Sequence, residues 1–246
     1  MRGAILYVHP FAEEMNKSRR MAALQARAFA RLGYSVLSLD LYGCGDSSGD
    51  FADARWDVWK RDVATAAAWL RDETHVPVHV WGLRLGATLA LECWREQPDG
   101  FSSALLWQPV MQGEQFMTQF LRLALAGDVV RESEETVSTE RLRDQLRKGQ
   151  VIEVGGYRLD PALVQAIDQC RLHQSLPAAA IHWLDVRRTA GEPPTSVRRT
   201  VDAWRARGSS LTYDAVVGDA FWASFDIIDV PGLIAATTAL YESDAT

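Results

Sequence analysis

The sequence has little cysteine, no excess of basic charge and no long apolar run. Its 246 residues include three scattered cysteines, Cys44, Cys93 and Cys170. An odd number without metal-ligand spacing argues against a disulfide framework and a metal site. The net charge of −6 argues against a nucleic-acid groove. No apolar run approaches the roughly 20 residues of a membrane helix, and the start, MRGAILYVHPFAEE, is unlike a signal peptide. We expect a cytoplasmic protein without a membrane span, a nucleic-acid partner, a metal or a cofactor.

Short apolar runs alternate with stretches of helical periodicity. The alternation predicts an α/β fold with a parallel, doubly wound sheet of about six strands. We expect the helix after the first strand to be capped by Asn16, which leaves Glu13 and Glu14 in the preceding loop. The predicted strands cover residues 4–10, 35–40, 76–83, 102–109, 178–186 and 209–217.

One segment, residues 109–177, interrupts the alternation. It contains helical stretches and a short hairpin, VIEVGGYRL, that turns at Gly155–Gly156. Asp160 followed by Pro161 predicts a capped helix start. The segment follows the fourth strand, where an insertion covers the ligand crevice of a parallel sheet. We therefore predict a cap at 109–177 and a core formed by 1–108 and 178–246.

Several motifs resemble a known superfamily. The loop HPF, the stretch DLYGCGDSSG and the turn WGLRLGA follow successive strands, as in the α/β-hydrolase superfamily. The chain begins at the third strand of that pattern and lacks the usual first two. HPFAEEMNKSRR, DLYGCGDSSGDFADARWD, WGLRLGA and WQPVMQGEQFMTQFLR more narrowly resemble the exosortase A system-associated hydrolases of type 2. This resemblance implies a hydrolase-like protein associated with exopolysaccharide synthesis or PEP-CTERM protein sorting.

The resemblance also locates the three residues that a serine hydrolase needs. Arg84 occupies the nucleophile position in WGLRLGA, and a guanidinium cannot attack a carbonyl. Alignment on Phe221 puts Ala220 at the histidine position. Asp185 lies near the place of the acid, with Glu192 as a second option. The two residues that carry the chemistry are therefore replaced, which predicts a protein without Ser-His-Asp catalysis.

The altered turn still favours an anion. Backbone amides at a helix N-terminus attract negative charge, and the amides of Leu85 and Phe11 are the expected donors. Arg84 adds a guanidinium that suits a carboxylate or phosphate. His9 lies in the same loop as Phe11 and is expected to shape it. The first hypothesis is a small anionic or acyl ligand bound at Arg84.

Other hypotheses stay open. A buried arginine needs a partner, and either Glu13 or Glu14 would pair with Arg84 and fill the site. A second hypothesis is a genuine ester or thioester hydrolase, with Glu14 as a base on water and Arg84 polarising the carbonyl. Cys44 in GCGDSS is the other candidate nucleophile, although no histidine has an obvious claim to be its base.

A third hypothesis is a non-catalytic interaction subunit. Its partner would be a protein encoded at the same locus, or a second copy that pairs through the sheet edge left by the absent strands.

Overall fold

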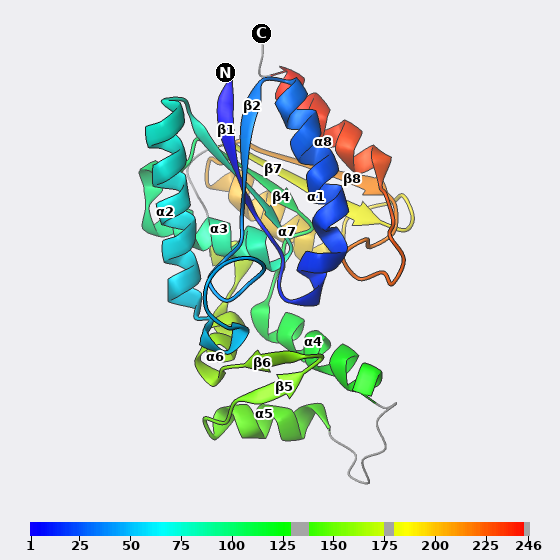
Figure 1. Ribbon diagram of the computed structural model, residues 1–246. Coiled ribbons are helices and arrows are strands. Elements are labelled where there is room, and N and C mark those ends of the chain that lie inside the picture. The colour runs from blue at the N-terminus through cyan, green and yellow to red at the C-terminus, as the bar shows by residue number, and fades with distance from the viewer. Residues whose placement is uncertain (129–137, 175–179, 244–246) are drawn as a thin grey trace.

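A six-stranded parallel sheet forms the centre of the molecule (Figure 1). The computed structural model describes residues 1–128, 138–174 and 180–243. The strand order is β2-β1-β3-β4-β7-β8, and every adjacent pair is parallel, which confirms the predicted fold class. The predicted boundary at 177–178 lies outside the described residues. The strands are β1 (Gly3–Val8), β2 (Tyr34–Leu39), β3 (Val78–Leu83), β4 (Ser103–Trp107), β7 (Ala180–Arg187) and β8 (Leu211–Val217).

Helices cover both faces of this sheet because successive strand residues point to opposite sides. In β1, Leu6 and Val8 belong to one apolar layer, whereas Ile5 and Tyr7 belong to the other. Both layers are buried, which explains why the strands read as continuous apolar runs. The first layer packs against α2 (Trp56–Thr74), α3 (Leu85–Glu96) and α7 (Thr195–Ala206), and the second against α1 (Glu13–Arg31) and α8 (Pro231–Ser243).

Helix α1 begins earlier than the sequence predicted. Its first residue is Glu13, so the prediction of a cap at Asn16 was wrong. Glu13 and Glu14 occupy the first turn, where negative charge interacts favourably with the helix dipole. Ala12 precedes them at a φ of 49°. Glu14 is therefore carried by a helix rather than by a loop.

The segment between β4 and β7 lies beyond one end of the sheet (Figure 1). We call residues 113–174 the insert. The predicted hairpin is present, and the Asp160 side chain accepts a hydrogen bond from the Ala162 amide at 2.7 Å, with Pro161 at the first helical position. The insert comprises α4 (Gly113–Asp128), α5 (Thr139–Arg147), β5 (Ile152–Val154), β6 (Tyr157–Leu159) and α6 (Pro161–Gln169).

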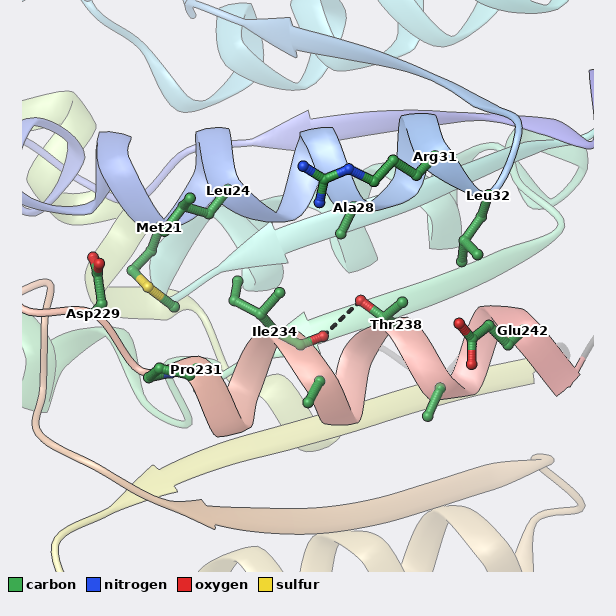
Figure 2. Close-up of a pocket in the computed structure, with 12 residues that line it drawn as sticks. Met21, Leu24, Ala28, Arg31, Leu32, Asp229, Pro231, Ile234, Thr238 and Glu242 are labelled. Carbon is green, nitrogen blue, oxygen red and sulfur yellow. Dashed lines mark hydrogen bonds between the residues drawn. The ribbon is translucent and has the colours of Figure 1, made fainter.

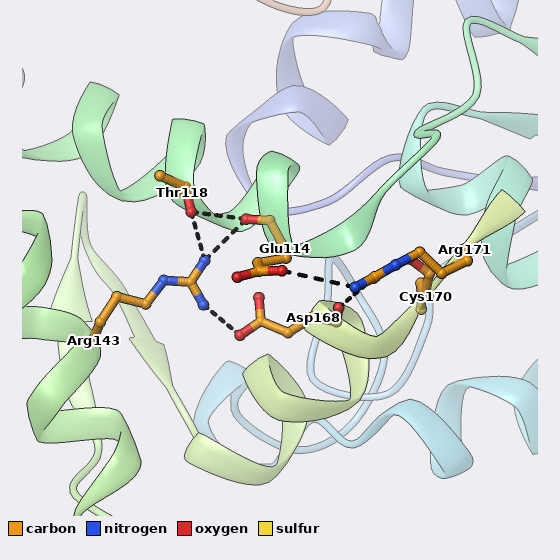
Figure 3. Close-up of polar contacts among 6 residues, drawn as sticks. All are labelled: Glu114, Thr118, Arg143, Asp168, Cys170 and Arg171. Carbon is orange, nitrogen blue, oxygen red and sulfur yellow. Dashed lines mark hydrogen bonds and ion pairs between the residues drawn. The ribbon is translucent and has the colours of Figure 1, made fainter. Parts of the chain in front are cut away.

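Polar contacts hold the insert together (Figure 3). Arg143 of α5 pairs with Asp168 of α6 and donates to the Thr118 hydroxyl of α4 at 2.8 Å. Where the chain enters and leaves the insert, the Gly113 amide donates to the Cys170 carbonyl at 3.0 Å. A Cβ at Gly113 would lie 1.6 Å from the Ile167 carbonyl oxygen, so only glycine allows this approach. These contacts make the three helices one unit.

Two contacts attach the insert to the core near the start of α2. Arg55 at the start of α2 pairs with Asp160 at 2.7 Å. The ring of Tyr157 on β6 lies 5.0 Å from that of Phe51, centroid to centroid. Both contacts involve the segment between β2 and the first turn of α2.

Helices α1 and α8 lie side by side over one face of the sheet, and a groove of about 640 Å³ runs between them (Figure 2). Its walls are mainly apolar, including Leu24 and Leu32 of α1 and Ile234 of α8. Neither Arg84 nor Glu14 lines it.

Candidate functional site

The strand order reverses between β1 and β3. The chain leaves β1 toward β2 and leaves β3 toward β4, so the two connections diverge. In open parallel sheets, ligands bind at the carboxyl ends of the strands at such a reversal. Residues 9–12 follow β1, and Arg84 follows β3. The topology therefore places these two segments at the expected position of a ligand site.

Arg84 alone forms the turn between β3 and α3, in a strained conformation. Its φ is 56° and its ψ is −120°, values that residues other than glycine rarely adopt. Its amide donates to the Trp107 carbonyl at 2.9 Å, and its carbonyl accepts from the Val110 amide at 3.3 Å. A Cβ at Gly86 would lie 2.3 Å from the His9 carbonyl oxygen, so the turn is pressed against the end of β1. The surrounding backbone thus fixes Arg84 at the carboxyl end of β3, beside the strand reversal.

Three separate parts of the chain surround the Arg84 guanidinium. Its Nε and Nη2 each lie 3.2 Å from Oε1 of Glu14 on α1. Its Cζ lies 5.7 Å from the ring centre of Phe116 on α4 and 5.3 Å from that of Trp222 in the loop after β8. Such cation–π contacts are favourable, more so when they are partly desolvated. Of the two acids predicted as partners, the structure pairs Glu14 with Arg84.

The Glu14 carboxylate is incompletely satisfied. Oε1 accepts a hydrogen bond from Arg84 Nε and forms an ion pair with Nη2, whereas Oε2 is buried and has no hydrogen-bond partner among the described residues. Burial raises the pKa of Glu14, and the opposing effects of Arg84 and Lys17 do not cancel it. Glu14 therefore takes up a proton more readily than an exposed glutamate would.

Glu13, the other predicted partner, has different contacts. Its Oε2 accepts hydrogen bonds from the Tyr157 hydroxyl at 3.3 Å and from Asn16 Nδ2 at 3.4 Å. Glu13 therefore links α1 to β6 of the insert at the surface.

His9 is buried, and both of its ring nitrogens have a partner. Nδ1 donates to the Pro10 carbonyl at 2.7 Å, and Nε2 accepts from the Leu41 amide at 3.3 Å. Burial lowers the pKa of His9, which favours the neutral ring that these two bonds require. The side chain joins the loops after β1 and β2.

Phe11 and Leu85 lie on either side of the strand reversal. Within the described ranges, neither backbone amide donates a hydrogen bond to another residue. Both side chains are buried. The Phe11 ring makes edge-on contacts with Phe116 and Phe120 of α4, with centroids 5.8 Å and 5.1 Å apart. Two unused donors and an aromatic wall thus lie near the arginine.

Asp185 lies at the end of β7, in the region predicted for the acid. It accepts hydrogen bonds from Trp183 Nε1 at 2.7 Å and from the Tyr213 hydroxyl at 3.0 Å. Burial raises the pKa of the Asp185 carboxyl. Ala220, at the predicted histidine position, lies two residues before Trp222 and packs against the second apolar layer. Tyrosine and tryptophan donors therefore satisfy Asp185 without an imidazole.

Cys44 is a buried thiol. Burial and the nearby carboxylates of Asp40 and Asp62 raise its pKa to about 12. At neutral pH it is almost entirely protonated, which is unfavourable for a nucleophile.

Two broader features concern metals and membranes. No group of three or more histidine, cysteine or acidic side chains within the described ranges is placed to hold a metal ion. No helix in that part of the chain is long and apolar enough to cross a membrane.

The two aromatic faces over Arg84 were only partly predictable. Phe116 belongs to the predicted cap segment, but no local pattern connects Trp222 with residue 84. The basic residues near the start of α1 contact the loop after β8. Arg20 forms a bidentate pair with Asp229 at 2.7 and 2.8 Å, and Lys17 lies 4.8 Å from the ring centre of Phe225. These two cations have partners of their own, distinct from those of Arg84.

Solved structures with the same fold include several esterases and related proteins. Est1E from Butyrivibrio proteoclasticus with bound ferulic acid is 14% identical, with a TM-score of 0.68 over 100% of this chain and 90% of the other. Mouse alpha/beta hydrolase domain-containing protein 10 is 16% identical, with a TM-score of 0.60 over 98% and 90%. The putative non-heme bromoperoxidase BpoC from Mycobacterium tuberculosis H37Rv is 15% identical, with a TM-score of 0.61 over 100% and 94%.

At sequence level, a search of the curated proteins finds no match. The serine aminopeptidase S33 family matches residues 1–172, well over half of the chain. The match includes β1 to β4, the turn between β3 and α3 at Arg84, and most of the insert. The chain therefore belongs to the serine aminopeptidase S33 family of the α/β-hydrolase superfamily.

Proposed function

We propose that this protein binds an anionic ligand at Arg84 and does not use Ser-His-Asp catalysis. The observation that carries the proposal is the guanidinium fixed at the strand reversal, on the turn that would present a nucleophile. A permanently charged side chain held at a ligand crevice favours a carboxylate or a phosphate. The amides of Phe11 and Leu85 are the proposed additional donors.

We propose that the segment 109–177, which contains the insert, forms the cap of this site. Phe116 of α4 contacts Arg84, and Phe120 contacts Phe11, so the insert contributes one wall. We propose a cytoplasmic setting from the sequence composition, and a role in exopolysaccharide synthesis or PEP-CTERM sorting from the motif resemblance alone.

A second candidate function is hydrolysis without a covalent intermediate. The favouring observation is Glu14, whose Oε2 is buried without a partner among the described residues and whose pKa is raised. Such a carboxylate could remove a proton from water while Arg84 polarises an ester carbonyl. Cys44 is a weaker candidate because its thiol is buried and protonated.

Two measurements on the same samples separate these functions. The first is thermal unfolding with acetate, benzoate, sulfate or phosphate added. The second is turnover of p-nitrophenyl esters and acyl thioesters. The proposal predicts that anions stabilise the wild type, that Arg84→Gln loses this response, and that neither protein turns over substrate.

Arg20→Gln is the matched control because it removes an exposed arginine that is also paired with an acid. It should keep the anion response. Turnover that Glu14→Gln abolishes would favour the hydrolase, and an anion response unchanged in Arg84→Gln would refute binding at Arg84.

A further inference from the structure

We propose that an anion binding at Arg84 is accompanied by proton uptake at Glu14, so that the site prefers a monoanionic carboxylate. This inference rests on the proposed function and specifies its ligand class and its pH dependence. It follows from how Arg84 and Glu14 share a confined space.

The Arg84 guanidinium is already surrounded by other side chains. Its Cζ lies over the rings of Phe116 and Trp222. Glu14 Oε1 takes the edge formed by Nε and Nη2. A carboxylate hydrogen-bonds a guanidinium in its plane, so an arriving anion either binds the remaining N–H groups on Nη1 and Nη2 beside Glu14 or displaces Glu14. Either way, two negative groups compete for one cation.

The competition is costly because the pair is largely removed from water. The side chains of Arg84 and Glu14 are each 18% exposed. Two anions beside one guanidinium would leave an excess negative charge in a region of low dielectric. A like charge nearby raises a carboxyl pKa, since it disfavours the ionised form. Protonation of Glu14 removes the excess charge.

Two cations oppose protonation of Glu14, but burial outweighs them and raises its pKa. Arg84 of the β3–α3 turn is the main cation, and Lys17 on α1 is the second. Asp185 at the end of β7 is a further acid whose charge interacts with Arg84. Glu13, on the same turn of α1, is held by Tyr157 of β6. The wall residues from α4 and from the loop after β8 are aromatic and carry no charge.

The alternative to protonation is movement of the Glu14 side chain away from Arg84, which helix α1 restricts. Glu14 lies in the first turn of a 19-residue helix. Its Oε2 is already buried with no partner among the described residues, so protonation there loses no hydrogen bond. Burial already raises the pKa of Glu14 before any ligand binds. Proton uptake is therefore an easier response than moving the side chain into water.

This coupling predicts the ligand class. After Glu14 is neutralised, a single carboxylate balances the charge of Arg84, whereas a phosphate dianion leaves one excess negative charge. The aromatic walls formed by Phe116 and Trp222 suit an apolar group attached to that carboxylate. The site is thus built for an apolar monocarboxylate rather than for a phosphate ester.

Calorimetric titration with benzoate tests the coupling. Titrations in two buffers of different ionisation enthalpy, repeated between about pH 5 and pH 8, give the number of protons taken up. We expect uptake of up to one proton per bound benzoate. Affinity should weaken by up to about tenfold per pH unit above the pKa of Glu14 in the free protein. Sulfate should bind more weakly than benzoate at each pH.

Two variants make the test specific. Glu14→Gln should bind benzoate with no proton uptake and little pH dependence, and more tightly than the wild type at pH 8. Glu13→Gln, which alters the neighbouring acid, should keep the uptake. Wild-type binding without uptake, or uptake that persists in Glu14→Gln, would overturn the coupling while leaving anion binding intact. No benzoate or sulfate binding at any pH would overturn both proposals.

Discussion

The geometry of the Arg84–Glu14 pair predicts how much unfolding free energy is lost when Arg84 is replaced. Replacing Arg84 with glutamine keeps a polar side chain but removes the only cation that hydrogen-bonds Glu14 among the described residues. At 3.2 Å and an effective dielectric constant of about 20, the Coulomb attraction is about 5 kcal/mol. Removing one partner of a buried pair costs roughly 3–5 kcal/mol. Because both side chains keep some exposure, we expect a loss of about 2–3 kcal/mol at pH 8.

The double variant Arg84→Gln/Glu14→Gln distinguishes the interaction energy of the pair from the interactions of each residue with its surroundings. It leaves two neutral amides that can hydrogen-bond each other, so its free energy of unfolding should lie within about 1 kcal/mol of the wild type. The double-mutant cycle should then give a coupling of about 2 kcal/mol.

The pH dependence has a definite sign. The folded pKa of Glu14 is above its unfolded value, so folding binds protons between the two values. The stabilising contribution is full below the unfolded pKa and is lost as pH rises through the folded pKa. Loss of Arg84 raises the folded pKa further. Arg84→Gln should therefore cost less at pH 5 than at pH 8.

Urea unfolding at both pH values measures these quantities. A cost below about 0.5 kcal/mol at pH 8, or a cost that does not change with pH, would show that the pair is effectively solvated. Competition between Glu14 and an anion for Arg84 would then be too weak to cause proton uptake.

Three further predictions concern the surrounding residues. We predict that Asp185, near the end of β7, can act as the acid, so that Arg84→Ser combined with Ala220→His hydrolyses p-nitrophenyl acetate faster than either single variant; equal rates in all three would refute this role of Asp185. Cys44 should react with iodoacetamide much more slowly in the folded protein than in the unfolded chain at pH 8, and rapid reaction would contradict a buried thiol with a pKa of about 12. Trp222→Ala removes the aromatic ring beside the Arg84 guanidinium and should weaken benzoate binding a few-fold by calorimetry, whereas unchanged affinity would exclude Trp222 from the site.

Much of the fold was predictable because it depends on local patterns. Doubly buried parallel strands must be apolar throughout, so runs such as VPVHVWGL mark strands even without alternation. Asp160–Pro161 marks a helix start because the carboxylate caps it and proline needs no hydrogen bond there. The start of α1 was misplaced because Asn16 is a good cap in general, whereas here the loop after β1 turns directly into the helix at Ala12.

The site was less predictable because it depends on contacts between distant segments. Arg84 itself is conspicuous, since the motif around it leads one to expect a different residue. Whether Glu13 or Glu14 pairs with Arg84 depends on where α1 begins. Because α1 begins at Glu13, both acids lie on its first turn. Trp222 reaches Arg84 from 138 positions along the chain. Only the folded arrangement of α4, β3 and the loop after β8 brings the two aromatic rings to the guanidinium.

The most direct test of the central claim is a crystal structure of the protein with 4-bromobenzoate. The bromine can be located by its anomalous scattering, and the carboxylate position follows from it. The account predicts the carboxylate within hydrogen-bond distance of the Arg84 guanidinium, with the ring beside Phe116 and Trp222. Bromine bound elsewhere, with Arg84 still held by Glu14 alone, would contradict it.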